Sequence, residues 1–410
     1  MQRYDVAVAG AGLGGLAAAA LLSARGKKVM VSTPHASLAE ALGVTAADGF
    51  LFSSSPALLH GFEAGGAFQQ LFHESGIHDM EPAHAAVYQV ALPDRRITIS
   101  RNQEETNEDL RREFPREIDT IVRFYRDLKK AADHGSQSRI AAFFSNLRSA
   151  GTFIRRYRFS SGFLTFLDVQ SLYFYQRPSA ELTLAMLMTL CTRRPAAVTG
   201  EYQKLAEHLT EVIIRKDGEV RLNEPYGEIM LQRDRAKGLM TAQGAVETGK
   251  VLLCTDEKSK HSLFLGIKDE VVPVGMARDV LYLPDYARPL DVLACSLSEK
   301  DDLAAASKGM RALAISFPSS PGQTHDPNTL IERVSGLVPF LKDFLVLTRD
   351  YRTSEAPAVA RGLSFNPLSP RQSEPLLFKA SKKNVYLLHE AQHAPLQVLT
   401  AARKFVDKIS

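Results

Sequence analysis

The first 33 residues alternate between apolar and glycine-rich stretches, and this pattern predicts a strand, a tight turn, a helix and a second strand. An apolar run at 6–9 leads through glycines into an alanine- and leucine-rich stretch that ends before Gly26. A second apolar run occupies 28–31. Because glycine is typical of helix ends and short continuous apolar runs are typical of buried parallel strands, the stretch predicts a βαβ unit.

Downstream of this unit the pattern divides the chain into strand-rich and helix-rich parts. Asp48-Gly49 predicts a tight turn into a strand, and two further strands flank a turn at Pro93-Asp94. Helical periodicity replaces strand signals from about 103 to 195. The remaining predicted elements are helices at 67–75, 204–214, 327–345 and 396–409, and strands at 219–222, 228–232, 237–242, 251–254 and 384–388.

The helix-rich part carries many aromatic residues at helical spacing. A packed core explains such residues in most proteins, and the alternative is an apolar channel for a substrate. Both interpretations stay open from the sequence. The residues are Phe143, Phe144, Phe153, Phe159, Phe163, Phe166, Tyr173, Phe174 and Tyr175, with Met186 and Met188 downstream.

Composition and charge exclude several classes of protein. The chain has 410 residues, of which 45% are hydrophobic and 23% charged, and this is a globular composition with room for two or three domains. The 50 basic and 46 acidic residues give a net charge of +4, too balanced to predict a nucleic-acid partner. Cys191, Cys254 and Cys295 lie far apart, so we expect neither disulfides nor a zinc site and predict a reducing cytoplasm.

The ends and the surface add two expectations about location. The N-terminus shows no secretion signal, and no apolar run approaches the length of a membrane span. A basic cluster at 155–158 lies beside several aromatic residues. It is either a solvated helix end or a contact with an anionic membrane surface, so we predict a cytoplasmic protein with a possible place at the inner face of a membrane.

The glycine-rich turn predicts a dinucleotide site. In the G-x-G-x-x-G fingerprint the first glycine allows a tight turn, the second lets a pyrophosphate approach the backbone, and the third lets helix pack on strand. Phosphates then lie at the helix N-terminus, where free N–H groups and the helix dipole favour an anion. The alternative is an alanine-rich core helix after a glycine loop. The predicted contacts are Gly10, Gly12, Leu13, Gly14 and Gly15.

The end of the second strand departs from the fingerprint. Asp or Glu is expected there to hold two ribose hydroxyls, whereas this chain has Ser32-Thr33-Pro34-His35. We predict Thr33 as the ribose contact, although a hydroxyl makes only one such hydrogen bond. No arginine lies near Thr33, and this argues against NADP. An NAD(P)-dependent enzyme is a further hypothesis beside the two functions given below.

Three later stretches extend the motif pattern over nearly the whole chain. Residues 48–56 read D-G-F-L-F-S-S-S-P, Gly200 precedes a helix with leucines four residues apart, and the strand at 385–388 leads into His389-Glu390. In this order the features resemble the FAD-dependent amine oxidase superfamily, and within it the phytoene desaturase, carotenoid isomerase and retinol saturase branch. Only the N-terminal fingerprint is a specific motif; the others are partial matches.

The resemblance implies an α/β fold and FAD as cofactor. We expect a doubly wound, Rossmann-like FAD/NAD(P)-binding domain assembled from 1–75, 200–265 and 350–410. An inserted α+β substrate domain with a helical cap would comprise 76–199 and 266–349. Glu390 aligns with the aspartate of the family's C-terminal L-[AC]-G-D motif, so the resemblance makes it a cofactor contact.

Several family positions differ in this chain. Thr33 aligns with the family's Glu, 38–42 lacks the arginine of a G-G-R stretch, and serines replace an aspartate and a glycine after residue 52. His389 replaces the glycine before Glu390. Glycine there would let the backbone approach a flavin, and a side chain prevents this. Two alternatives follow: FAD is bound in an altered way, or it is not bound.

Two functions are consistent with these observations. The first is a FAD-dependent oxidoreductase, similar to desaturases or isomerases, that acts on a small apolar substrate such as an isoprenoid or polyene; the flavin then takes the hydride and the protein supplies a water-poor pocket. The second is a non-catalytic, flavin-losing relative that binds a ligand or serves as a partner subunit. The predicted assembly is a homodimer or a pair with an intact homologue.

The chemistry-bearing residues near the C-terminus are His389, Glu390 and His393. They either give a loop its polarity or contact phosphate or ribityl groups and exchange protons near a flavin. The H-x-x-x-H spacing lies in a predicted loop before Pro395, so we predict no metal site. The sequence shows no compact arrangement of nucleophile, histidine and carboxylate, and it assigns no catalytic residue.

Overall fold

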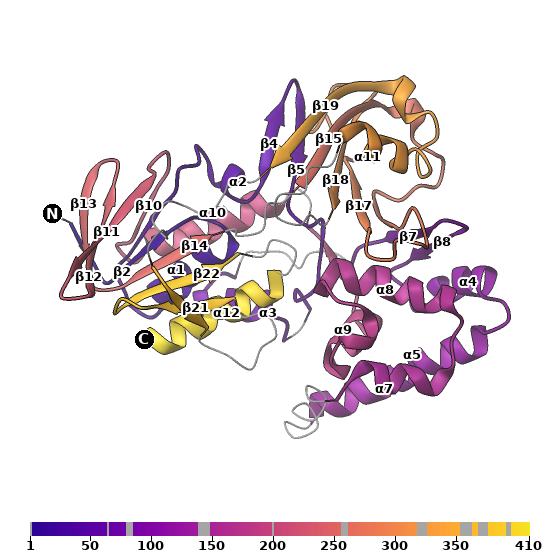
Figure 1. Ribbon diagram of the computed structural model, residues 1–410, viewed down its shortest axis with the longest axis horizontal. Coiled ribbons are helices and arrows are strands. Elements are labelled where there is room, and N and C mark those ends of the chain that lie inside the picture. Colours follow the sequence, from indigo (N-terminus) through magenta and orange to yellow (C-terminus); the bar gives the residue numbers. More distant parts are fainter. Residues whose placement is uncertain are drawn as a thin grey trace.

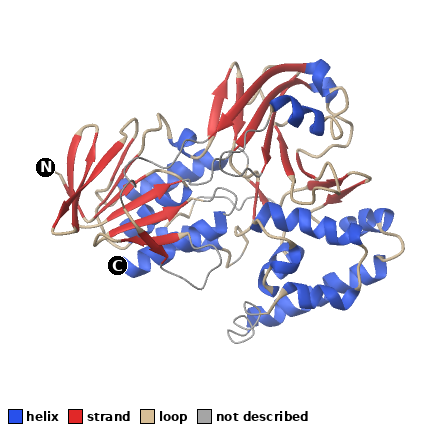
Figure 2. Ribbon diagram, in the orientation of Figure 1, coloured by secondary structure: helices blue, strands red, loops and turns tan. Residues whose placement is uncertain are grey.

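The computed structural model describes residues 2–63, 65–78, 85–137, 148–198, 201–255, 261–317, 326–352, 363–367, 376–390 and 395–410. Two seven-stranded sheets and a lobe of helices make up the body of the molecule (Figure 1). The first sheet lies with both chain termini at one end, and the second sheet and the helical lobe lie at the other (Figures 1 and 2).

The first sheet has the strand order β10-β3-β2-β14-β22-β21-β20. The five strands from β10 to β22 are parallel, and β21 and β20 are antiparallel to their neighbours. This confirms the Rossmann-like arrangement, because β2, α1 and β3 form the predicted βαβ unit. The strands are β2 (Val6–Ala9), β3 (Val29–Ser32), β10 (Glu219–Arg221), β14 (Val251–Thr255), β20 (Phe365–Pro367), β21 (Leu377–Ala380) and β22 (Val385–His389).

The apolar runs of this sheet are continuous because both of its faces are covered. Side chains of a strand point alternately to the two faces. In β2, Val6 and Val8 pack against helices, whereas Ala7 and Ala9 pack against a second, smaller sheet. Helix α1 contacts α3, α10 and α12. The helices are α1 (Leu13–Ala24), α2 (Leu38–Ala41), α3 (Ala67–Ser75), α10 (Glu201–Ile214) and α12 (Pro395–Ile409).

The smaller sheet has the order β1-β13-β12-β11 and covers the other face. It arises from a strand-turn-strand-turn-strand segment between β10 and β14, in which β11, β12 and β13 are antiparallel. The sequence pattern predicts strands over β11 and β12 but no strand at β13. The strands are β1 (Arg3–Tyr4), β11 (Tyr226–Gln232), β12 (Arg235–Thr241) and β13 (Gly244–Thr248).

The second large sheet has the order β19-β15-β18-β17-β16-β7-β8 and is mixed, since β16 pairs in parallel with β7 and the other pairs are antiparallel. Helix α11 packs on one face, and the β4-β5 hairpin packs on the other. The elements are β4 (Val44–Ala47), β5 (Phe50–Ser53), β7 (Tyr88–Leu92), β8 (Arg95–Ile99), β15 (His261–Lys268), η3 (Asp269–Val271), β16 (Asp279–Tyr282), β17 (Leu293–Leu297), β18 (Met310–Phe317), α11 (Pro327–Val334), η4 (Leu341–Phe344) and β19 (Leu345–Arg352).

The helical lobe packs beneath β7, β8 and β16 of the second sheet (Figure 1). Its described aromatic residues include Phe163 and Phe166, which are buried in one cluster with Tyr88 and Leu281 of the sheet. Phe163 and Phe166 are therefore core residues, whereas Tyr173, Phe174 and Tyr175 of the same predicted set line cavities. The elements are α4 (Gln103–Glu113), α5 (Ile118–Gln137), α7 (Ala150–Ile154), η1 (Arg155–Tyr157), α8 (Ser161–Tyr175), η2 (Ser179–Glu181) and α9 (Leu184–Thr192), and β6 (Leu58–Leu59) pairs with β9 (Ala196–Ala197) nearby.

One predicted helix is wrong in length. The pattern predicts a helix over 327–345, but α11 ends at Val334 and 345 begins β19. Gly336 packs against Tyr282, where a Cβ would lie 2.5 Å from the tyrosine oxygen, and Pro339 follows. Proline cannot continue a helix, so the chain turns here. The predicted domain bounds stay a prediction. Two of them, at residues 265 and 350, fall inside β15 and β19.

Candidate functional site

The glycine turn between β2 and α1 is held by close backbone contacts. Gly10 has a φ of +120° and donates its N–H to the carbonyl of Ser32 at 2.8 Å, which joins the ends of β2 and β3. A Cβ added at Gly15 would lie 2.3 Å from the Gly10 carbonyl oxygen. A Cβ at Gly14 would lie 2.6 Å from Leu388 of β22. The predicted fingerprint therefore has the close helix-on-strand packing that its glycines allow.

The carboxylate of Glu390 lies on the N-terminus of α1. The N–H of Gly15 donates to its Oε1 at 2.8 Å, and a Cβ added at Gly12 would lie 1.8 Å from its Oε2. The N–H of Glu390 donates to the carbonyl of Thr255 at 2.8 Å, which fixes this residue just beyond β22. We call the α1 N-terminus with Gly12 and the Gly15 N–H the phosphate site. A side chain of the chain itself supplies the anion there.

A narrow cleft opens beside the phosphate site and contains about 30 Å³ of free volume. We call it the cofactor cleft. None of the described residues that line it is Lys, Arg or His, and Glu390 is the lining residue that carries a charge at neutral pH. The lining residues are Gly12, Leu13, Ala41, Leu42, Ser55, Pro56, Tyr202, Glu390, Pro395 and Val398.

Two serines after β5 hold the chain beside this cleft on the α2 side, and Ser55, which stands at the family's glycine position, lines it. The Ser54 hydroxyl donates to the carbonyl of Gly43 at 3.1 Å, and the Ser55 hydroxyl donates to the carbonyl of Leu42. These bonds hold the segment after β5 against the end of α2. Because Ala41 and Leu42 face the cleft where the family has its arginine stretch, this wall is apolar.

Thr33 is buried at the end of β3 and has little capacity left for a ligand. Its Oγ1 lies 3.4 Å from the His35 N–H, and its carbonyl accepts the N–H of Glu224 at 2.9 Å. The Glu224 side chain is fully buried and pairs with Arg221 at 3.2 Å. A carboxylate thus stands beside the end of β3, as the fingerprint requires, but it comes from a distant segment and is already held by an arginine.

These contacts decide whether FAD fits the residues present. A flavin dinucleotide brings a doubly charged pyrophosphate, and the phosphate site already contains the Glu390 carboxylate. Like charges at contact distance repel strongly in a partly buried cleft. The described cleft lining offers no cation to offset this repulsion. As folded, the site does not fit FAD.

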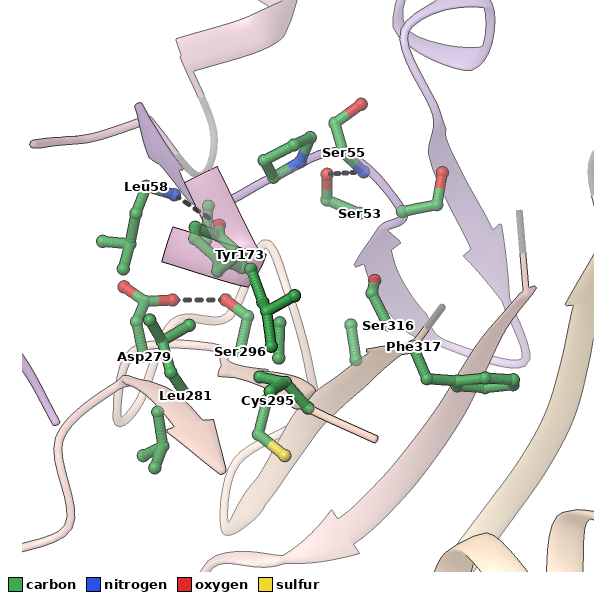
Figure 3. A pocket seen from close by; sticks show the side chains of 18 of the residues that line it. Ser53, Ser55, Leu58, Tyr173, Asp279, Leu281, Cys295, Ser296, Ser316 and Phe317 are labelled. Atoms are coloured by element: carbon green, nitrogen blue, oxygen red, sulfur yellow. Dashed lines mark hydrogen bonds between the residues drawn. The ribbon is translucent and has the colours of Figure 1, made fainter. Parts of the chain in front are cut away.

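A second and larger cavity lies between β16, β17 and β18, helix α8 and the segment 53–58 (Figure 3). We call it the central cavity. It has about 80 Å³ of free volume and mainly apolar walls. At its edge the Leu58 N–H donates to the hydroxyl of Tyr173 at 3.2 Å (Figure 3). Ser55 and Pro56 line both this cavity and the cofactor cleft, so the two spaces are neighbours.

Asp279 is the charged residue in the wall of the central cavity. It is 3% exposed and accepts a hydrogen bond from Ser296 at 2.6 Å (Figure 3). It also pairs with Arg278 at 2.8 Å. Burial raises the pKa of the Asp279 carboxyl above its ordinary value, although Arg278 and Ser296 oppose this shift. The pair therefore holds a polar group inside an apolar wall without leaving it unsatisfied.

A third and small cavity of about 20 Å³ adjoins the central one and shares Pro56, Leu58 and Tyr173 with it. His60 lines it and is 2% exposed, and neither of its ring nitrogens has a hydrogen-bond partner among the described residues. Burial lowers the pKa of His60 to about 3, so its ring is neutral at pH 7. Tyr175 lines the same cavity, and its hydroxyl has no hydrogen-bond partner within the described part of the chain.

The other candidate residues lie apart from these cavities. His389 packs edge-on against Phe378 at a ring distance of 4.7 Å, and its Nδ1 lies 3.3 Å from the Thr255 hydroxyl. Predicted residues that lie outside the described part of the chain are Phe143, Phe144, Gly200 and His393. The three cysteines are buried and unpaired, and the described residues contain no cluster of His, Cys, Asp and Glu that would hold a metal.

The basic cluster ends α7 and η1 at the tip of the helical lobe. Arg155, Arg156 and Arg158 are exposed there. Their contact with an anionic membrane stays a prediction. Within the described residues no helix is both long and apolar enough to cross a membrane.

Sequence patterns did not identify His60, Asp279 or Glu224 as site residues, and they gave Tyr175 as one of the aromatic residues of a core or an apolar channel. His60 has a weak signal, since it is a lone histidine in the apolar stretch 57–62. The others look like ordinary polar residues of strands and helices. They become significant only when the fold buries them beside a cavity or a strand end.

Comparisons with known proteins agree with this architecture. Residues 8–75 match the family described as NAD(P)-binding Rossmann-like domain. A prolycopene isomerase from Daucus carota is 22% identical in an alignment of 331 positions that covers 66% of this chain. The aligned part corresponds to 54% of that isomerase, so the chain spans about half the length of this relative.

Solved structures share the fold over essentially the whole chain. An oxidoreductase from Methanosarcina mazei has a TM-score of 0.63 at 15% identity and covers 97% of this chain with all of its own. RAB GDI from Plasmodium falciparum has a TM-score of 0.67 at 10% identity, with coverage of 100% and 97%. A double mutant of putrescine oxidase has a TM-score of 0.55 at 12% identity, with coverage of 100% and 99%.

The matches include two proteins named for oxidation chemistry and one, RAB GDI, whose name describes no oxidoreductase. At these identities the structural matches establish the fold and leave the chemistry open. Residues 8–75 match the NAD(P)-binding Rossmann-like domain family, and the chain as a whole shares its fold with the oxidoreductase from Methanosarcina mazei and with putrescine oxidase.

Proposed function

We propose that this chain binds a slender apolar molecule of the polyene or isoprenoid class in its central cavity, and that it does so without flavin. It would then serve as a non-catalytic binding protein or partner subunit. The observation that carries this proposal is the apolar cavity between β16–β18 and α8, next to a cofactor cleft that contains its own anion.

The size and lining of the central cavity define the ligand. Each methylene transferred from water to such walls contributes about 0.8 kcal/mol, so a hydrocarbon chain gains affinity from length alone. A free volume of about 80 Å³ favours a narrow chain over a fused ring system. Putrescine is a cation, whereas Asp279 in this wall is already neutralised by Arg278. A charged amine therefore has no free partner among the described residues there.

The small cavity defines one end of the ligand. His60 and Tyr175 both line it, and their buried polar atoms have no hydrogen-bond partner among the described residues. An unsatisfied buried polar group costs roughly 1–3 kcal/mol, and a ligand oxygen would remove this penalty. About 20 Å³ is room for one oxygen atom or water. The ligand is thus an apolar chain that ends in a hydroxyl or carbonyl group.

Binding of all-trans-retinol by the purified protein tests the proposal. Retinol fluorescence should rise on titration, and replacement of Ala294, a small residue in the cavity wall, by Leu should weaken binding at least about tenfold by filling the cavity. Leu303→Phe on the exposed surface is the matched control and should bind as the wild type does. Equal retinol affinity in A294L and the wild type would refute this site.

A flavin-dependent oxidoreductase that acts on the same ligand is the second candidate. The retained turn at Gly10, Gly12 and Gly15 favours it, because its backbone geometry still suits a pyrophosphate. It requires Glu390 to leave the phosphate site. Absorbance at about 450 nm in the protein as purified, and release of FAD on denaturation, would establish this second candidate against the first.

The partner of the chain and its location are also part of what we propose. A homodimer or a pair with an intact homologue is part of the proposal, and the size of the purified chain alone and with such a homologue tests it. Contact of 155–158 with an anionic membrane is likewise a proposal. Co-sedimentation with phosphatidylserine vesicles, compared between the wild type and a variant with Arg155, Arg156 and Arg158 changed to Ser, tests that contact.

A further inference from the structure

We propose that Glu390 takes the place of a nucleotide phosphate: its carboxylate is the anion that the glycine turn and the α1 N-terminus bind in this protein. Nucleotide binding and the folded position of Glu390 then exclude each other. This inference concerns the phosphate site alone and does not rest on an apolar ligand in the central cavity.

Geometry is the first support. Glu390 Oε1 accepts the Gly15 N–H at 2.8 Å, as a phosphate oxygen would at a helix N-terminus. The three atoms nearest to a Cβ placed on Gly12 all belong to the Glu390 carboxyl group, at 1.8, 2.6 and 3.0 Å. The absence of a side chain at 12 is what makes room for a phosphate in the fingerprint. Here the same room is filled by a carboxylate.

Electrostatics is the second support. Helix α1 has no acidic residue in its first turn and its N-cap, Gly12, has no side chain to accept a hydrogen bond. An anion that stabilises the positive end of the helix dipole must therefore come from another part of the chain. The carboxylate of Glu390 supplies it, and its negative charge contributes to raising the pKa of the neighbouring Cys254 thiol, after the larger effect of burial.

The backbone around Glu390 is the third support. Its N–H donates to the Thr255 carbonyl and the N–H of His389 donates to the Leu376 carbonyl, both at 2.8 Å. These bonds set the direction in which the side chain leaves the end of β22. A glutamate at this point reaches one methylene further than an aspartate would. That extra length brings the carboxylate to the helix N-terminus.

The test is anion rescue of the Glu390→Ala variant. Removal of the side chain leaves the Gly15 N–H without its acceptor and opens the phosphate site, so E390A should melt below the wild type. Inorganic pyrophosphate should then raise the Tm of E390A by about 2 °C or more and leave the wild type unchanged. ADP should bind E390A at least about tenfold more tightly than it binds the wild type.

A second variant keeps the test informative if E390A folds poorly. Glu390→Gln keeps an acceptor for the Gly15 N–H but removes the charge, so it should stay folded and show a smaller rise of Tm with pyrophosphate. Glu332→Ala, an exposed glutamate paired only with Lys342 at the surface, is the matched control and should show no rise. A wild type that binds ADP as well as E390A does would overturn the proposal, as would variants that gain no affinity for pyrophosphate or ADP.

The outcome is separate from that of the retinol experiment. Pyrophosphate and ADP report on the phosphate site, whereas retinol reports on the central cavity. Retinol binding with no anion rescue supports the proposed function and refutes the role of Glu390. Anion rescue without retinol binding supports the role of Glu390 and refutes the proposed function.

Discussion

The backbone N–H of Gly15 donates a hydrogen bond of 2.8 Å to the carboxylate of Glu390, a residue 375 positions further along the chain. The first helix of the protein is thus completed by a residue that follows the last strand of its sheet. Four substitutions test the glycine turn around this contact and the buried polar residues of the two cavities.

Gly12→Ala should destabilise the fold through Glu390. The new Cβ would lie 1.8 Å from Glu390 Oε2, so the carboxylate must leave its place and the Gly15 N–H loses its acceptor. We expect a loss of about 1–3 kcal/mol in the free energy of unfolding. In the E390A background the same substitution should cost about 1–2 kcal/mol less, because the two residues are in contact. Urea unfolding of the four proteins measures this coupling, and simple additivity would contradict it.

Gly15→Ala should destabilise the fold independently of Glu390. Its Cβ would meet the Gly10 carbonyl oxygen at 2.3 Å, and this backbone atom cannot yield without disturbing the junction of β2 and β3. We expect a loss of about 2–3 kcal/mol. Gly249→Ala is the control, since it is exposed and has nothing within 4 Å of the new Cβ, and it should stay within about 0.5 kcal/mol of the wild type.

His60→Leu should reduce the loss of stability that the wild type shows in acid. Burial lowers the pKa of His60 from 6.5 to about 3, so the folded state keeps the ring neutral while the unfolded state takes up a proton. Stability from this group is complete above pH 6.5 and is lost as the pH falls toward 3. Between pH 6.5 and about 4 the wild type should lose roughly 3 kcal/mol more than H60L. Parallel pH profiles in urea unfolding would contradict the neutral, unpartnered ring.

Asp279→Asn should have the opposite pH dependence. Burial raises the pKa of the Asp279 carboxyl above 3.8, so the folded state binds a proton more tightly than the unfolded state does. Stability from this group is complete below pH 3.8 and is lost as the pH rises through the higher folded pKa. D279N has no such loss and should gain stability relative to the wild type from pH 3.8 upward. A difference in Tm that does not change with pH would show that Arg278 fully offsets burial.

The local pattern predicted much of the fold. Apolar runs and glycines predicted β2, α1 and β3 because both faces of this sheet are buried, which makes its strands continuous in hydrophobicity. The pattern likewise predicted α3 and α12. The pattern failed at β13 and at the end of α11, since a half-exposed strand and a proline-stopped helix carry weak periodic signals.

The sequence by itself determined the Rossmann-like unit and the positions of Gly10, Gly12 and Gly15, because a tight turn and close helix packing can be satisfied only by residues without side chains. It also placed Glu390 after the last strand. What that glutamate contacts was decided only by the tertiary structure, since β14 and β22 bring the two ends of the chain together. The burial of His60 and the pairing of Glu224 with Arg221 depend in the same way on contacts between distant segments.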